Sequence, residues 1–219
     1  MAALGGQPAR PKAEGRKARR LFGPPPQSEA KGRGIRLLGG HMLPSPSEAR
    51  ARQVSMFQLI KSLNYWKGRR GYKPEAIVIH ITDGDRKSVI NWFLTPASRV
   101  SAHYLICKDG DIIKFVEEKD TAWHCGLIKN PKWSSLKVGV NPNYYTIGLE
   151  FEGFNHDQLS LVQFLVGAWL LFKISASWGI ALDFEHVIPH NWINGSKACP
   201  GLGINLSYLI RLAKILKNS

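Results

Sequence analysis

Two segments more than a hundred residues apart in the 219-residue chain carry side chains that could bind a metal ion. The first is an apolar stretch with His80 near its end, and the second carries His190 and, nine residues later, Cys199. Two imidazoles and a thiolate form a common zinc ligand set, and three protein ligands leave the fourth position of a tetrahedral ion open for water. An open position distinguishes a catalytic zinc site from a structural one, so the pattern predicts a zinc hydrolase.

Two carboxylates and a lysine supply the other groups that this chemistry needs. A water on the metal requires a general base within reach. Strand alternation along residues 147–152 places Glu150 and Glu152 on the face opposite the large apolar residues, so both are candidates. Lys197 stands two residues before Cys199, where its charge could stabilise an oxyanion. The alternative is an ordinary surface lysine in a chain that has many.

A sheet with flanking helices is expected to position these groups. The stretch 76–81 predicts a buried strand with His80 near its carboxyl end, where open α/β sheets bind their ligands. Asp109-Gly110 predicts a hairpin turn between two further strands. The remaining expectations are strands over residues 102–107, 111–116 and 145–151, and helices over residues 87–95, about 158–175 and about 205–217. Together they predict one α/β (α+β) domain, with a single mixed β-sheet flanked by helices.

Composition divides the chain into three parts. Residues 1–46 are rich in Gly, Pro, Ala, Arg and Lys and predict a disordered basic tail, for which a cloning junction or a misassigned start codon is an equal explanation. Residues 47–72 predict a helix capped by Ser47 and a linker, and residues 73–219 predict the catalytic domain. Of the net charge of +14, residues 1–55 contribute +8.

The composition argues against a disulfide-rich protein, a membrane-spanning protein and a protein with a cleaved export signal. Three cysteines without a CxxC pair argue against a disulfide framework and indicate synthesis in a reducing compartment. No window reaches the ~18 apolar residues of a membrane span, and no apolar core of a cleaved export signal begins the chain. Cytoplasmic synthesis without a signal peptide is therefore expected. The basic charge favours a polyanionic partner, such as nucleic acid, an anionic membrane or envelope polymers, but no nucleic-acid motif is present.

Six short motifs occur in order along most of the chain after residue 70. They are Ile-Val-Ile-His80-Ile-Thr, Val100-Ser-Ala-His103-Tyr-Leu-Ile, Lys108-Asp-Gly110, Ala122-Trp123-His124-Cys-Gly126, Ile147-Gly-Leu-Glu150-Phe-Glu-Gly153, and Pro189-His190 through Lys197-Ala-Cys199-Pro. In order and approximate spacing this set resembles the zinc-dependent N-acetylmuramoyl-L-alanine amidase family. That family includes phage endolysins, bacterial recycling amidases and peptidoglycan recognition proteins.

The resemblance implies a metal site. His80, His190 and Cys199 would hold Zn²⁺, in a family whose third ligand is either Asp or Cys. The histidine of the second segment has an alternative, because His186 stands only four residues before His190. The Trp and the Gly-Ser-Lys-Ala-Cys-Pro run that follow His190 resemble the ligand segment of phage amidases and favour it.

The resemblance also implies catalytic and substrate-binding residues. Glu150 would be the base and Lys197 the electrostatic stabiliser, while Glu152 would be a structural carboxylate. His124 would lie in the substrate groove, with Trp123 packing beside it or contacting sugar. His103 fits a structural role equally well.

The implied reaction is hydrolysis of the amide bond between N-acetylmuramic acid and L-alanine in peptidoglycan. We expect a monomeric phage or prophage endolysin, made in the cytoplasm and released to the cell wall, with the basic tail free to bind anionic envelope polymers. The alternatives are a cytoplasmic muropeptide-recycling amidase and a non-catalytic peptidoglycan-binding protein. A nucleic-acid-binding protein is supported by charge alone.

Overall fold

The computed structural model describes residues 57–218. The basic tail expected over residues 1–46 and the first part of the helix expected after Ser47 lie outside the described residues. The described chain forms one six-stranded sheet in the order β1-β5-β4-β7-β3-β8 and a separate pair, β2 with β6. The strands are β1 (Phe57–Leu59), β2 (Tyr65–Trp66), β3 (Ala76–Ile81), β4 (Tyr104–Ile106), β5 (Ile112–Lys114), β6 (Thr121–Ala122), β7 (Thr146–Phe151) and β8 (Val187–Pro189).

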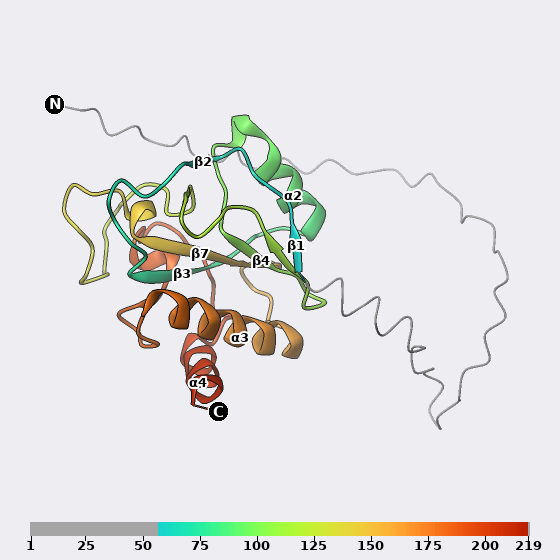
Figure 1. Cartoon of the computed structure of the whole chain (residues 1–219). Coiled ribbons are helices and arrows are strands. Elements are labelled where there is room, and N and C mark those ends of the chain that lie inside the picture. Colours follow the sequence, from blue (N-terminus) through green and yellow to red (C-terminus); the bar gives the residue numbers. More distant parts are fainter. Residues whose placement is uncertain (1–56, 219) are drawn as a thin grey trace, which may run out of the picture. The chain divides into compact units, whose positions relative to one another are not determined.

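Helices cover both faces of the six-stranded sheet. The described helices are α2 (Arg86–Leu94), α3 (Leu161–Trp178) and α4 (Leu206–Lys217), with 3-10 turns η1 (Pro96–Ser98), η2 (Pro142–Tyr144) and η3 (His190–Trp192). On one side α3 and α4 lie together, and α2 lies on the other (Figure 1). The sheet is mixed, because β4 pairs antiparallel with β5 and parallel with β7. The expected single mixed sheet flanked by helices is therefore confirmed.

The centre of the sheet is the parallel pair β3 and β7, in which His80 is in register with Glu150. Every residue of both strands is buried, and aliphatic residues dominate them, as is usual for strands covered on both faces. Alternation sends one set of side chains to each face. The large apolar side chains point to the face covered by α3 and α4, here called the helical face, while His80 and Glu150 point to the opposite face.

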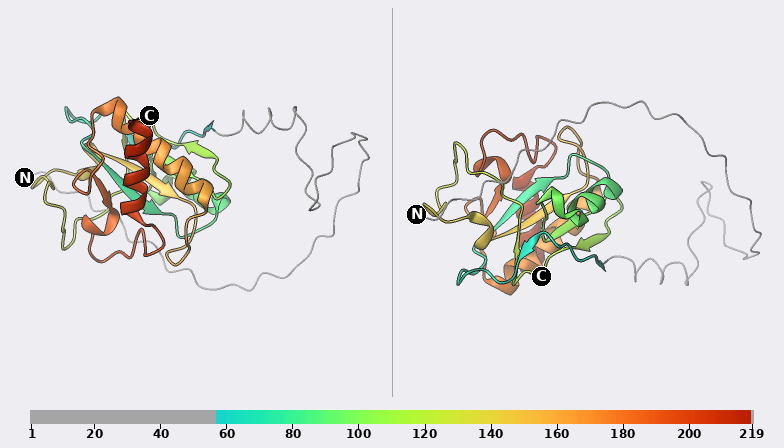
Figure 2. Two further views of the ribbon diagram at one scale, coloured as in Figure 1. Left: turned by 90° about the horizontal axis from the view of Figure 1, so that it is seen from below. Right: turned by 90° about the horizontal axis from the view of Figure 1, so that it is seen from above.

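The apolar face packs against α3 and α4. Ser160 begins α3 with a capping box, in which its side chain accepts from Gln163 N and the Gln163 side chain accepts from Ser160 N. Gly167 lets the ring of Phe151 approach the helix, since a Cβ there would lie 2.6 Å from Phe151 Cζ. Viewed from below, α4 lies across α3 (Figure 2). Its Leu209, together with side chains of β3, β7 and α3, belongs to the largest buried cluster.

The second face carries two smaller clusters instead of one. Under α2, which lies over the strands when viewed from above (Figure 2), Val89 and Phe93 pack with Leu105 and Phe115. The other cluster packs the 125–145 loops against Val78 at the opposite end of the sheet. This division leaves the polar residues of β3 and β7 facing loops instead of a helix.

The expected helix over residues 47–66 is wrong for its described part. Residues 57–59 and 65–66 form the short strands β1 and β2 instead, and β1 pairs in parallel with β5. Leu59 and Leu63 are 65% and 68% exposed, whereas a helix packed on the core would bury its apolar residues. The backbone instead satisfies the edge of β5, where Ile60 N donates to Lys114 O and Ser62 N to Phe115 O. Edge hydrogen bonding therefore outweighs the apolar spacing.

The other predicted elements agree with the structure within a few residues. Two further strands that the sequence did not predict, β6 and β8, are only two and three residues long. Within residues 57–218, α3 is the one helix long and apolar enough to cross a membrane by length and composition, a test that a core helix also passes. Its inward residues belong to the large cluster, which agrees with its interpretation as a core helix.

Candidate metal centre

The three predicted metal ligands come together at the carboxyl end of β3. One ligand atom each from His80, His190 and Cys199 lies within 4.8 Å of the others, and the residues are buried or partly buried. His80 is the fifth residue of β3, and His190 follows β8 directly. Because Ile79 pairs with Pro189 in the parallel register, the next residues on both strands are the two histidines. Their ring centroids are 4.5 Å apart.

Cys199 reaches this site from the loop before α4. Its Sγ accepts a hydrogen bond of 3.3 Å from Ile81 N and lies 3.8 Å from His80 Nδ1. Asn191 N donates to Cys199 O at 3.0 Å, which ties the cysteine to the segment that carries His190. A donated N–H stabilises negative charge on sulfur, the form in which cysteine binds metals.

The donor set fits a tetrahedral ion. Bonds of about 2.3 Å to sulfur and about 2.0–2.1 Å to nitrogen place two ligands of a tetrahedral zinc about 3.6 Å apart. The separation of 3.8 Å between Cys199 Sγ and His80 Nδ1 is close to that value. In addition, the second ring nitrogen of His190 lies 3.0 Å from Cys125 O, the kind of outer contact that metal-binding histidines make. The three residues can therefore hold a metal ion with one position open.

The alternative ligand His186 lies elsewhere. It is three residues before Pro189, about 10 Å along an extended chain, near the amino end of β3. Its Nδ1 contacts Asp183 Oδ1 at 2.6 Å, and its carbonyl accepts from Ile77 N. The geometry therefore places His190 beside His80 and Cys199, whereas His186 contacts Asp183 near the protein surface.

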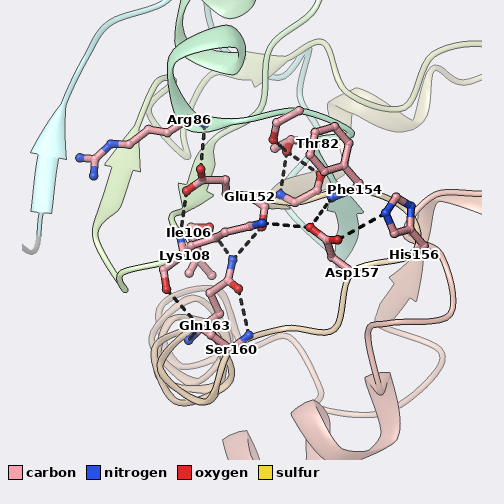
Figure 3. A network of polar contacts seen from close by, with 12 residues as sticks. Thr82, Arg86, Ile106, Lys108, Glu152, Phe154, His156, Asp157, Ser160 and Gln163 are labelled. Carbon is pink, nitrogen blue, oxygen red and sulfur yellow. Dashed lines mark hydrogen bonds and ion pairs between the residues drawn. The ribbon is translucent and has the colours of Figure 1, made fainter. Parts of the chain in front are cut away.

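The two candidate carboxylates have different environments. Glu150 is 4% exposed and stands beside His80 in the sheet register, on the same face. Glu152 lies past the end of β7, where its two oxygens accept from Arg86 N at 2.9 Å and Lys108 N at 2.8 Å (Figure 3). Glu152 therefore joins two loops to the end of the sheet, which is the structural role predicted for it.

His124 lies beside His80, within the protein. It is 6% exposed, and its Nδ1 lies 3.1 Å from His80 Nε2, so it stands behind a metal ligand. Its Nε2 lies 3.3 Å from Thr146 Oγ1. These contacts lie within the protein, and the predicted contact of His124 with substrate stays a prediction. Trp123 is partly buried, and its ring lies against that of Trp66, with centroids 5.2 Å apart.

Lys197 is exposed on the loop that carries Cys199. Its backbone N donates to Asn194 O at 3.0 Å, which closes a turn. The chain therefore places Lys197 in the metal-binding loop, with its side chain in solvent. The other two cysteines, Cys107 and Cys125, are buried free thiols.

Burial sets the charge of the groups behind the metal-binding residues. Desolvation, with the nearby His190, lowers the pKa of His124 to about 3, and desolvation lowers the pKa of His103 well below its usual value. Desolvation also raises the pKa of the Cys125 thiol to about 12. All three side chains are therefore neutral near pH 7.

Arg69 is a buried residue that the sequence analysis did not identify. Its guanidinium donates to the carbonyls of Glu118, Asn143, Tyr144 and Thr146 at 2.6–3.3 Å. Desolvation lowers its pKa to about 10, so it remains charged. It fixes the entry of β7 to the 118–120 loop. Only the three-dimensional contacts single it out among the many cations of this chain.

The fold is that of an α/β domain in which two histidines and a cysteine at the carboxyl ends of β3 and β8 could hold a metal ion. The sequence profile described as N-acetylmuramoyl-L-alanine amidase matches residues 70–202, more than half of the chain. This chain therefore belongs to the N-acetylmuramoyl-L-alanine amidase family.

Relatives and solved structures agree with this assignment. N-acetylmuramoyl-L-alanine amidase A of Achromobacter lyticus is 31% identical over 139 residues, which are 63% of this chain and 64% of the relative, so the match spans less than two thirds of that protein. The 1,6-anhydro-N-acetylmuramyl-L-alanine amidase AmpD of Citrobacter freundii is 42% identical over 55 residues, 25% of this chain and 26% of AmpD.

The fold is shared with two solved structures of related name. A selenomethionine derivative of AmpD superposes with a TM-score of 0.61 at 22% identity, covering 72% of this chain and 94% of that chain. A mutant endolysin from Bacillus subtilis superposes with a TM-score of 0.54 at 20% identity, covering 72% and 97%.

Proposed function

We propose that this protein is a zinc-dependent N-acetylmuramoyl-L-alanine amidase, which hydrolyses the amide bond between N-acetylmuramic acid and L-alanine in peptidoglycan. The observation that carries the proposal is the convergence of His80, His190 and Cys199 beside the buried Glu150, in a member of this family. His80, His190 and Cys199 would hold the zinc ion. When bound, zinc supplies a Lewis acid that polarises an amide carbonyl and makes water more acidic.

The chain's own residues would supply the proton transfers and the charge. Glu150 would accept a proton from the attacking water and return it to the leaving amine, and its buried position strengthens its electrostatic interactions. Lys197 would bring its positive charge to the carbonyl oxygen on which negative charge develops. Because Lys197 is exposed, we expect substrate binding to draw its side chain in. Replacement of Lys197 with Ala should then lower kcat about 10²-fold or more without loss of metal.

Mass spectrometry of digested peptidoglycan tests the reaction itself. The zinc-loaded protein should release free amino termini of L-alanine without new reducing sugar ends. Release of reducing sugar ends alone would overturn the proposal in favour of a glycosidase. The matched variant Cys199→Ser should neither retain zinc nor release L-alanine termini, and an active, zinc-free variant would remove Cys199 from the site.

For the biological setting we propose a phage-type endolysin, made in the cytoplasm and acting as a monomer on the cell wall after release. A cysteine as third ligand supports it, since the branch of the family with a thiolate ligand includes phage enzymes, along with recognition proteins. The AmpD match supports a cytoplasmic recycling amidase as the second candidate. Rates on intact sacculi and on soluble anhydro-muropeptides separate the two, because an endolysin should prefer sacculi. Light scattering tests the monomer.

We further propose that the basic segment before residue 56 binds anionic envelope polymers. Its share of the net charge, +8 for residues 1–55, supports this. Removal of residues 1–55 should weaken binding to teichoic-acid-bearing walls at low salt and leave binding at high salt unchanged. Equal binding by the two forms at low salt would contradict it.

A further inference from the structure

A two-residue segment, His124-Cys125, contacts both candidate histidine ligands on the side away from the metal position. His124 Nδ1 lies 3.1 Å from His80 Nε2, and Cys125 O lies 3.0 Å from His190 Nε2. The Nε2 atom of each candidate ligand is therefore in contact with this segment, while His80 Nδ1 lies 3.8 Å from Cys199 Sγ. One short piece of chain touches two ligands that are 110 positions apart in the sequence.

The direction of the hydrogen bonds at His124 follows from Thr146, which contacts the ring nitrogen farther from His80. Thr146 Oγ1 donates to Pro142 O at 2.8 Å, so the hydroxyl proton is already placed. Thr146 Oγ1 can then only accept from His124 Nε2, at 3.3 Å. With its proton on Nε2, the neutral His124 ring presents a lone pair at Nδ1. His80 must therefore donate from its own Nε2 and carry a lone pair at Nδ1, the atom nearest Cys199 Sγ.

At His190 a carbonyl determines the tautomer. A carbonyl oxygen can only accept, so the contact with Cys125 O requires a proton on His190 Nε2. In the neutral ring the lone pair is then on Nδ1. The Cys125 thiol, which is 3.5 Å from Thr146 Oγ1, can donate to the same hydroxyl without opposing this arrangement.

The segment itself is held by η2 and by β7. The side-chain oxygen of Asn143 accepts from His124 N at 3.1 Å and from Cys125 N at 2.9 Å. Gly148 provides the space for the imidazole, since a Cβ at this position would lie 2.5 Å from His124 Cγ. The backbone and the ring of His124 therefore have little freedom to move.

We propose that His124-Cys125, anchored by Thr146 and Asn143, sets the tautomer of both metal-binding histidines before the metal binds. The inference rests on the proposed metal site but concerns the protein without its metal. These residues are positioning residues, because they act through His80 and His190. Loss of such outer partners typically weakens metal binding about 10–100-fold.

The matched pair Thr146→Val and Thr146→Ser tests the chain of hydrogen bonds. Valine keeps the shape of threonine and removes the hydroxyl, whereas serine keeps the hydroxyl. The ring nitrogens of the metal-free protein are examined by long-range ¹H–¹⁵N correlation, and zinc affinity is measured by competition with a chelator. Wild type and Thr146→Ser should show a proton on Nε2 of both His80 and His190.

The expected signature of Thr146→Val is a change at only one ligand. His80 should become a mixture of tautomers, and zinc affinity should fall about tenfold. His190 should keep its proton on Nε2, because Cys125 O is untouched, and this selectivity would not follow from general destabilisation. An unchanged His80 tautomer in folded Thr146→Val would overturn the inference.

A second pair of variants covers the case in which Thr146→Val does not fold. His124→Asn keeps an acceptor near the Nδ1 position, whereas His124→Phe keeps a ring without an acceptor. Phenylalanine should weaken zinc binding about 10–100-fold and asparagine only a few-fold. Equal affinities would overturn the inference. A wild-type protein that binds no zinc would contradict the proposed function instead, and the tautomers of its histidines would still be measurable.

Discussion

The two faces of β3 and β7 use the same strands for different purposes. On the helical face, Ile79 and Leu149 are completely buried in one large apolar cluster shared with α3 and α4. On the other face, His80 and Glu150 are also buried, but their neighbours are loops and polar groups. Neighbouring residues of one strand therefore differ in what they contribute. The helical face supplies stability through area and packing, and the loop-covered face supplies directional contacts of individual atoms.

The largest effect should come from a metal ligand on the loop-covered face. His190→Ala should abolish zinc retention and reduce turnover to background, because two ligands hold zinc poorly. His186→Ala is the matched control four residues away and should retain zinc and activity, since His186 contacts Asp183 instead. Metal analysis after gel filtration and the amidase assay measure both. Equal zinc retention and activity of the two variants would contradict the assignment of His190, and not His186, to the metal site.

Two carboxylates on successive outward positions of one chain segment should separate catalysis from structure. Glu150→Gln should lower kcat about 10²–10⁴-fold with zinc retained, because the amide cannot accept the proton. Glu152→Gln should keep kcat and lower the free energy of unfolding by about 1–3 kcal/mol, since an amide cannot accept from both backbone N–H groups. Kinetics and urea unfolding of the two variants show the contrast. A fall in kcat only for Glu152→Gln would reverse the assignment.

A substitution on the helical face should affect stability alone. Leu149→Ala should lower the free energy of unfolding by about 2–5 kcal/mol through the cavity it leaves, while the folded fraction keeps its turnover. Leu161→Ala is the control, because this leucine of α3 is 72% exposed and should matter by less than about 0.5 kcal/mol. Thermal unfolding and assays at low temperature distinguish them. A loss of turnover without loss of stability would contradict the separation of the two faces.

A smaller effect should be the pH dependence of stability, which arises on the loop-covered face. Desolvation, with the nearby charge of Arg69, lowers the pKa of His103, so the unfolded chain binds a proton that the folded chain does not. The free energy of unfolding should therefore fall below about pH 6.5, by up to about 1.4 kcal/mol per pH unit. Urea unfolding of the metal-free protein measures it. His103→Gln should show a weaker dependence, and an unchanged dependence would exclude His103 as the cause.

The sequence predicts the centre of this molecule better than its edges. Strand β3 and the hairpin of β4 and β5 have local signals, an apolar run and an Asp-Gly turn, and both form as expected. Strands β1, β6 and β8 have two or three residues each, and they exist because a neighbouring strand offers hydrogen bonds. The local sequence of such a short strand does not show that a hydrogen-bonding partner is available.

The sequence predicts the three candidate metal ligands, which lie together in the structure, but it does not predict the residues that hold them in place. His80, His190 and Cys199 are chemically distinctive, and the motifs around them carry the resemblance. Asn143 and Thr146 act through hydrogen bonds to His124, which stands 19 and 22 residues earlier in the sequence. Only the folded structure shows that these residues are neighbours. The motif around His124 predicts a contact with substrate, but it does not predict the hydrogen bond to His80, because a motif does not show which side of a neighbouring residue a side chain occupies.

The loop that carries Cys199 packs against a second loop, and separation of the two would remove Cys199 from the candidate metal site. Side chains at Gly201 and Gly203 would clash with the backbone oxygens of Asn155 and Asp157, so the two loops lie directly against each other. The Asp157 loop is in turn held by Lys108 (Figure 3). A local opening of these paired loops would release the thiolate while the sheet remained folded. Metal occupancy should therefore appear in hydrogen exchange as slower exchange of these loop amides, well before the protection of β3 and β7 changes.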